Sequence, residues 1–145
     1  MSFVHLQVHS EFSILSASCR IKDILKAAVK NNQPAVALTD NGNMFGILEF
    51  FMQAQDLNKA RAKDNLPPVK PVVGCHIYVK TPNASTSDPT SYQRLTLFAE
   101  NQKGYYNLVK IVSYCYESPD RWAEIPDVPL EVVKEKREGI IALAG

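Results

Sequence analysis

The chain has 145 residues, of which 46% are hydrophobic and 9% aromatic, a composition typical of a globular protein with one core. Its formal net charge is +1 and it has no long basic run, so charge alone gives no reason to expect nucleic-acid binding by this chain. Its three cysteines lack paired spacing and no apolar run reaches membrane-spanning length; these features exclude a disulfide framework, a zinc knuckle and a membrane partner, and predict a cytoplasmic protein.

The first half of the chain predicts two strands and two helices. A strand over residues 3–8 precedes a helix that begins near Ile21, and the apolar run Ala35–Leu38 predicts a short buried strand. A turn over residues 39–43 leads into a second helix, which Pro67-Pro68 ends. The expected apolar stripe of this second helix is Met44, Ile47, Leu48, Phe51 and Leu57.

The second half predicts three more strands, over residues 72–79, 95–99 and 139–144, with an exposed loop over 81–91. A helix is expected over residues 105–114 and a short one over 130–136, with a proline-punctuated stretch around Trp122 between them. The longer helix is expected to bury Leu108, Val109, Ile111 and Val112.

Strand and helix thus alternate about five times, which indicates an α/β protein with a parallel sheet or barrel. Site residues are then expected at the carboxyl ends of the strands. The chain stops at Gly145, directly after an apolar strand whose outer edge would lack a partner, so we expect a piece of a longer protein.

Polar residues lie at or near the carboxyl ends of three of these strands. His9 follows the first, Asp40 the second, and His76 lies late in the third. Imidazole and carboxylate ligands of this kind suit zinc or manganese. The alternative is that the histidines are hydrogen-bonded core residues and that Asp40 serves only the turn, and the residues alone leave both interpretations open.

Five ordered blocks carry a resemblance to a known family: FVHLQVHSEFSIL, AVALTDNGNMFGILEFF, KPVVGCHIYV, LTLFAENQKGYYNLVKIVS and EGIIALAG. Together they resemble the N-terminal PHP (polymerase and histidinol phosphatase) domain of bacterial DNA polymerase III alpha subunits, the C-family replicative polymerases. The resemblance implies that residues 1–145 are the N-terminal part of a distorted (β/α)7-type PHP barrel with mostly parallel strands.

In family members with an intact site, PHP residues hold metal ions that support phosphoester hydrolysis. By resemblance, the first His-x-His pair falls on Gln7 and His9, and the aspartate of a Leu-Asp-Gly context falls on Ser16. The remaining positions are the histidine of a Thr-Asp-His turn, the glutamate of a Gly-Cys-Glu block and the histidine before a Leu-Thr-Leu strand. These correspond to Asn41, His76 and Arg94, and further ligands are expected after Gly145.

These substitutions predict a degenerate metal site. The amides of Gln7 and Asn41 are weak ligands for zinc-like ions, and replacing two carboxylates by Ser16 and His76 removes negative charge. Arg94 would add a permanent cation to the same cavity. A single ion held by His9, Asp40 and His76 is the weaker alternative.

The resemblance therefore implies a polymerase whose PHP part is a non-catalytic structural and docking module. Template-directed DNA synthesis, with its Mg²⁺ ions, would lie in the polymerase domain outside this sequence. Expected partners are the rest of the polymerase chain and a proofreading exonuclease subunit, with DNA reached through the parent protein. The alternatives are a metal-dependent PHP phosphoesterase or 3′–5′ exonuclease, and a stand-alone βα domain.

Overall fold

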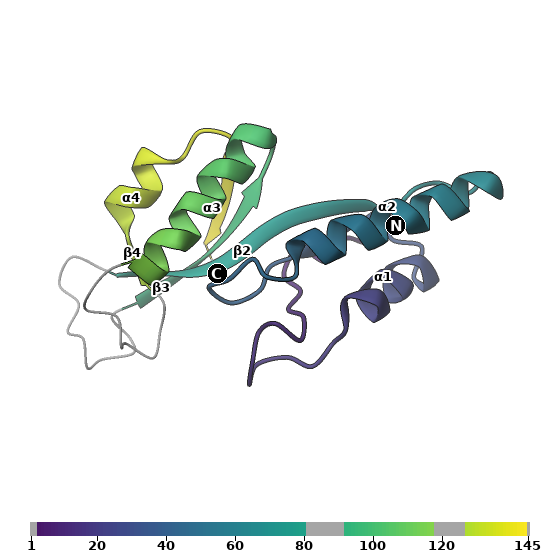
Figure 1. Cartoon of the computed structure of the whole chain (residues 1–145), viewed down its shortest axis with the longest axis horizontal. Helices are drawn as coiled ribbons and strands as arrows, with labels where there is room; N and C mark the ends of the chain where they lie inside the picture. Colours follow the sequence, from purple (N-terminus) through teal and green to yellow (C-terminus); the bar gives the residue numbers. More distant parts are fainter. Residues whose placement is uncertain (1–2, 81–91, 118–126, 145) are drawn as a thin grey trace. The chain divides into compact units, whose positions relative to one another are not determined.

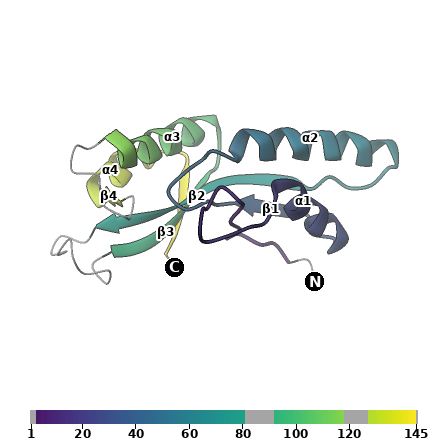
Figure 2. The ribbon, with the colours of Figure 1, turned by 60° about the horizontal axis from the view of Figure 1, so that its bottom comes forward.

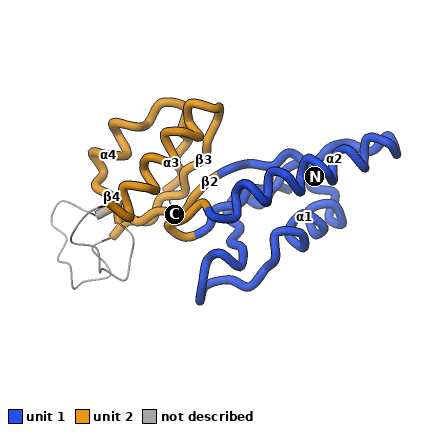
Figure 3. The backbone as a smooth tube through the Cα atoms, in the orientation of Figure 1, with its two compact units in different colours: residues 1–40, 45–73 blue, residues 41–44, 74–145 orange. Residues whose placement is uncertain are grey.

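The computed structural model describes residues 3–80, 92–117 and 127–144, and it divides into two compact units (Figure 3). Unit 1 comprises Met1–Asp40 and Phe45–Val73, and unit 2 comprises Asn41–Met44 and Gly74–Gly145. The predicted loop over 81–91 and the Trp122 stretch lie outside the described residues. In the described part of the chain, every helix is too short or too polar to cross a membrane.

The first helix and second strand of unit 1 form as predicted. Helix α1 (Ile21–Lys30) buries its apolar stripe of Ile21, Ile24, Leu25 and Ala28. Strand β1 (Ala35–Leu38) pairs in parallel with the first part of β2 (Lys70–Lys80), with Ala35 opposite Lys70 and Leu38 opposite Val73. Thr39 and Asp40 directly follow the carboxyl end of β1, and both are buried.

The predicted buried face of the second helix is wrong in part. Helix α2 (Ile47–Lys63) buries Ile47, Phe50 and Ala54, whereas Leu48 is 70% and Phe51 44% exposed. The spacing i, i+3, i+7 of the buried set defines one stripe, and each step of one residue turns a side chain by about 100° away from it. Leu48 and Phe51 each follow a buried residue, so both point off the stripe.

The predicted strand over residues 3–8 does not form a regular ladder, although the segment runs extended beside β1 (Figure 2). The Ala37 N–H donates to the His5 carbonyl at 3.0 Å, and the Thr39 N–H donates to the Val8 carbonyl at 2.8 Å. The Val8 N–H donates instead to the side-chain Oγ1 of Thr39, at 3.0 Å. Between the two backbone bonds the segment advances three residues and β1 only two, so the register is not that of a regular parallel ladder.

The turn after this segment holds Leu15 at a φ of 66°, with its side chain fully exposed. A residue with a Cβ costs about 1–2 kcal/mol in the left-handed region, and asparagine tolerates that region better because its short polar side chain can hydrogen-bond locally. We therefore expect Leu15→Asn to raise the free energy of unfolding by about 0.5–1 kcal/mol in denaturant titrations. The matched control is Ile14→Asn, an exposed neighbour outside the left-handed region, and an equal gain there would contradict the explanation.

Unit 2 contains the remaining strands, in a mixed arrangement. The second part of β2 pairs antiparallel with β3 (Tyr92–Ala99), and β3 pairs antiparallel with β5 (Ile140–Ala144). The short β4 (Asp127–Pro129) pairs in parallel with β2. The α/β class is confirmed, and in the described residues the sheet is mixed, with β1–β2 and β2–β4 parallel and β2–β3 and β3–β5 antiparallel. The sequence between β2 and β3 has no helical apolar period, and a parallel pair would need a helical crossover there.

Helix α3 (Gln102–Glu117) packs on the strands of unit 2, and α4 (Leu130–Glu135) contacts β4 (Figure 1). The interior of α3 is as predicted except for Val109, which is 36% exposed. The residues that α3 buries are Gly104, Asn107, Leu108, Ile111, Val112 and Cys115. Strand β5 forms as predicted but is largely exposed, with Ile141 at 50%, and in the described chain it pairs with β3 along one edge.

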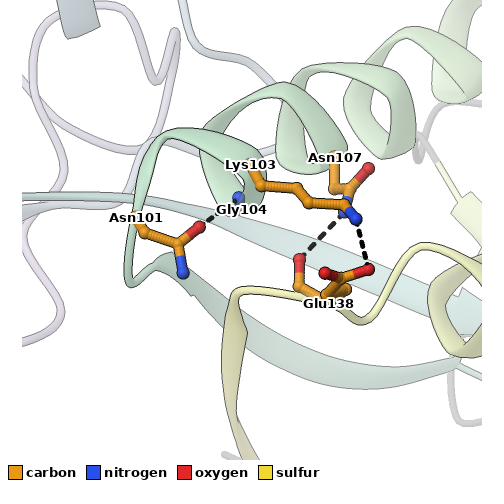
Figure 4. Close-up of polar contacts among 5 residues, drawn as sticks. All are labelled: Asn101, Lys103, Gly104, Asn107 and Glu138. Carbon is orange, nitrogen blue, oxygen red and sulfur yellow. Dashed lines mark hydrogen bonds and ion pairs between the residues drawn. The ribbon is translucent and has the colours of Figure 1, made fainter.

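Polar contacts fasten the start of α3 to the residues before β5 (Figure 4). The Gly104 N–H donates to Asn101 Oδ1 at 3.0 Å, which caps the helix. Asn107 Nδ2 donates to the Glu138 carbonyl at 2.9 Å, and Lys103 forms an ion pair with the Glu138 carboxylate. Both ion-pair side chains are more than half exposed, so the buried Asn107 bond contributes more than the salt bridge.

Candidate functional site

The carboxylate of Asp40 in unit 1 is buried, at 1% exposed. Its Oδ1 accepts hydrogen bonds from the Ser10 N–H and the Ser13 hydroxyl, both at 2.6 Å. Its Oδ2 accepts a hydrogen bond from the Ser10 hydroxyl at 2.7 Å. These are short charge-assisted bonds in a buried setting, so they tie the Ser10–Ser13 turn firmly to the end of β1.

In unit 2, His76 lies on β2 opposite Thr96 of β3, and both side chains are buried. The imidazole Nδ1 lies 3.3 Å from the Thr96 hydroxyl, and the ring packs edge-on against Tyr78 at a centroid distance of 5.9 Å. The backbone of Asn41 forms a parallel bridge with His76, and the Gly42 N–H donates to the His76 carbonyl at 2.7 Å. Asn41 and His76 are therefore neighbours within unit 2.

Arg94 lies on β3 opposite Tyr78, on the same face of the strands as His76 and Thr96. Its guanidinium carbon lies 5.8 Å from the centroid of the Tyr78 ring, and its side chain is exposed. At an exposed site such a cation–π contact is worth about 0.5–1 kcal/mol. The guanidinium of Arg94 thus lies over the Tyr78 ring on this face of unit 2.

The side chains at the predicted metal-site positions do not fit the metal cluster that the resemblance implies for an intact site. Within residues 3–80, 92–117 and 127–144, no three His, Cys, Asp or Glu side chains gather closely enough to hold a metal ion. Both oxygens of Asp40 already accept hydrogen bonds, and His76 Nδ1 faces a hydroxyl. Neutral amides at Gln7 and Asn41 add little affinity, so the residues give no support to a metal-activated water.

A family model described as the PHP domain matches residues 5–145, nearly the whole chain. The chain belongs to the PHP domain family. This PHP domain is similar to the DNA polymerase III subunit alpha of Pseudomonas aeruginosa, with 35% identity over 144 residues. The match covers 99% of this chain and 11% of that protein.

A second relative is the DNA polymerase III subunit alpha of Thermus aquaticus, which is 32% identical over 152 residues. That match covers 100% of the PHP domain and 12% of the relative, so the chain spans only a small part of the curated relatives it matches. Among solved structures, an amidohydrolase from Chromobacterium violaceum aligns with 74% of this chain and 32% of its own, at 16% identity and a TM-score of 0.46. That last likeness is too low to bear on function.

The positions predicted for the degenerate metal site are divided between the two units of the PHP domain. Those in unit 1 are Gln7, His9, Ser16 and Asp40, and those in unit 2 are Asn41, His76 and Arg94. Ser16 is exposed and contributes its backbone N–H to the Ser13 carbonyl at 2.9 Å. That these positions once formed one metal site stays a prediction.

Sequence reasoning missed the role of Ser10 and Ser13. Their signal was present: two hydroxyl residues three apart follow the segment that runs beside β1, and Asp40 follows β1 itself. Neighbouring segments that run in the same direction bring their following residues to one edge, where hydroxyls and a carboxylate can bond. The sequence alone did not establish that residues 3–8 and β1 are neighbours.

Proposed function

We propose that this PHP domain is part of a DNA polymerase III alpha subunit and serves template-directed DNA synthesis in chromosome replication. The supporting observation is the match of 99–100% of the chain to two proteins of that name, at 35% and 32% identity. The working environment of such a protein is the bacterial cytoplasm.

Within that polymerase we assign this chain a structural and docking role without chemistry of its own. Nucleotidyl transfer needs carboxylates that hold two Mg²⁺ ions, and we place them outside this sequence. The chain would brace the rest of the polymerase polypeptide and offer a surface to a proofreading exonuclease subunit, and it would reach DNA only through the parent protein. The residues at the site support this role, because hydrogen bonds occupy Asp40 and His76.

The rival function is a metal-dependent PHP phosphoesterase or 3′–5′ exonuclease. It needs several strong ligands around one or more metal ions, with an open position for water. His9, Asp40 and His76 are the residues that would have to supply them. The two proposed functions therefore predict different effects of substituting His9 and His76.

The test uses the complete gene product, as wild type and as a His9→Gln, His76→Gln double variant. We expect Mg²⁺-dependent primer extension at equal rates in both, and no release of 3′ nucleotides with Mn²⁺ or Zn²⁺ in either. Elemental analysis of protein purified without chelator should find far less than one zinc, manganese or iron ion attributable to residues 1–145.

Two results would overturn the proposal. Absence of primer extension by the wild type would remove the polymerase assignment. Release of 3′ nucleotides by the wild type that the double variant lacks, together with the loss of a stoichiometric metal ion, would establish the rival function instead.

A further inference from the structure

The buried carboxylate of Asp40 and the hydroxyls of Ser10 and Ser13 form one hydrogen-bonded cluster within unit 1. Ser10 is 0%, Ser13 2% and Asp40 1% exposed, so the cluster is shielded from water. The three bonds to the carboxylate measure 2.6, 2.6 and 2.7 Å. At such depth a carboxylate needs partners for its charge, and here hydroxyl and amide hydrogens supply them.

The serines also organise the turn that follows. The Ser10 hydroxyl accepts a hydrogen bond from the Phe12 N–H at 3.3 Å while it donates to Asp40. The Ser13 N–H donates to the Ser10 carbonyl at 2.9 Å, and the Ser13 carbonyl accepts from Ser16 and Ala17. One end of the turn is therefore fixed to β1 through Asp40.

We propose that Asp40 is a hydrogen-bond anchor for the Ser10–Ala17 turn and that its Oδ1, which accepts from both the Ser10 N–H and the Ser13 hydroxyl, is thereby closed to a metal ion. The inference deepens the proposed metal-free role and rests on it. A metal ion on Oδ1 would have to approach an oxygen that already faces the Ser10 N–H. That N–H belongs to the backbone, so it does not rotate away as a hydroxyl does. The N-terminal segment then keeps its conformation without metal.

The anchor is tested by thermal unfolding of the complete gene product with EDTA, with Mn²⁺ and with Zn²⁺. We expect the wild-type midpoint to be the same in all three. Ser13→Ala and Asp40→Asn should each lower it by several degrees, because a buried partner is left without its bond. The matched control is Ser16→Ala, whose exposed side chain lies in the same turn and should leave the midpoint unchanged.

Hydrogen exchange at the Ser10 amide gives a second, local readout. The Ser10 N–H should be protected in the wild type and lose protection in Asp40→Ala, while it stays protected in Ser16→Ala.

Three outcomes distinguish a failure of the Asp40 anchor from a failure of the proposed metal-free role. A metal-induced rise in midpoint that disappears in Asp40→Asn would make Asp40 a ligand and overturn the anchor. A rise that persists in Asp40→Asn but disappears in His9→Gln would contradict the metal-free role while supporting the anchor. Equal midpoints for Ser13→Ala and Ser16→Ala would overturn the anchor alone.

Discussion

Gly104→Ala is expected to destabilise the PHP domain strongly, by about 3 kcal/mol, although alanine is the better helix former. In an ordinary helix interior the change would stabilise by about 1 kcal/mol. Here a Cβ on Gly104 would lie 1.8 Å from the Gly139 carbonyl oxygen and 2.6 Å from its carbonyl carbon. Both are backbone atoms that no rotamer change moves aside, so the collision outweighs the helix propensity.

Hydrogen bonds hold the backbone around Gly139, so a small movement of that segment cannot relieve the clash. Gly139 has a φ of 73°, and its carbonyl accepts a hydrogen bond from the Glu100 N–H at 2.9 Å. Asn107 fixes the preceding residue, Glu138, through its carbonyl (Figure 4). To accommodate a methyl group, α3 would have to separate from this segment and these bonds would break.

Denaturant titration of Gly104→Ala beside Lys110→Ala gives the measurement. Lys110 is an exposed residue of the same helix, and its change to alanine should alter the free energy of unfolding by less than about 0.5 kcal/mol. A Gly104→Ala variant that is as stable as Lys110→Ala would show that α3 and Gly139 do not approach as closely as described.

The parts of the fold that sequence reasoning predicted are those with a strong local signal. The stripe of α1 repeats at helical spacing with charged residues between its members, and the four residues of β1 are all apolar. The buried face of α2 was harder to predict, because Ile47, Leu48, Phe50 and Phe51 are all apolar and fit two stripes. Tertiary packing selects Ile47 and Phe50, and no local rule ranks them above Leu48 and Phe51.

Strand direction was also beyond local reasoning. Alternation of strands and helices favours a parallel sheet, yet β3 runs antiparallel to both of its neighbours. The direction of a strand depends on how the chain returns to the sheet, and the periodicity of the strand itself carries no such information. The exposed β5 illustrates the same limit, since an apolar run indicates burial only once its neighbours are known.

The candidate site was predicted by residue type but not by contact. The resemblance identified Asn41 and His76, and the structure brings their backbones together in unit 2. The residues that bind Asp40 are serines, which the sequence offers in many places and which carry no spacing signature of their own. Only the parallel course of residues 3–8 and β1 makes those two serines the partners of Asp40.

Asn58→Ala is expected to lower the free energy of unfolding by about 2 kcal/mol, the second large effect. The Asn58 amide spans the buried Val69: Nδ2 donates to the Val69 carbonyl at 2.9 Å, and the Val69 N–H donates to Oδ1 at 2.8 Å. Truncation leaves two backbone groups without these partners, at about 1–1.5 kcal/mol each. Alanine recovers only about 0.5 kcal/mol of helix propensity, so the loss dominates.

The matched control is Gln55→Ala, which removes an exposed amide from the same helix and should leave stability unchanged. Asn58→Asp should not rescue the loss, because it keeps the acceptor for the Val69 N–H but sets an oxygen against the Val69 carbonyl.

Val69 directly precedes the part of β2 that pairs with β1, and Asp40 follows the end of β1. If the Asn58 bonds hold that register, Asn58→Ala should also weaken exchange protection of the Ser10 amide. Normal stability and protection in Asn58→Ala would instead show that the pairing of β1 and β2 holds the Asp40 anchor in place without them.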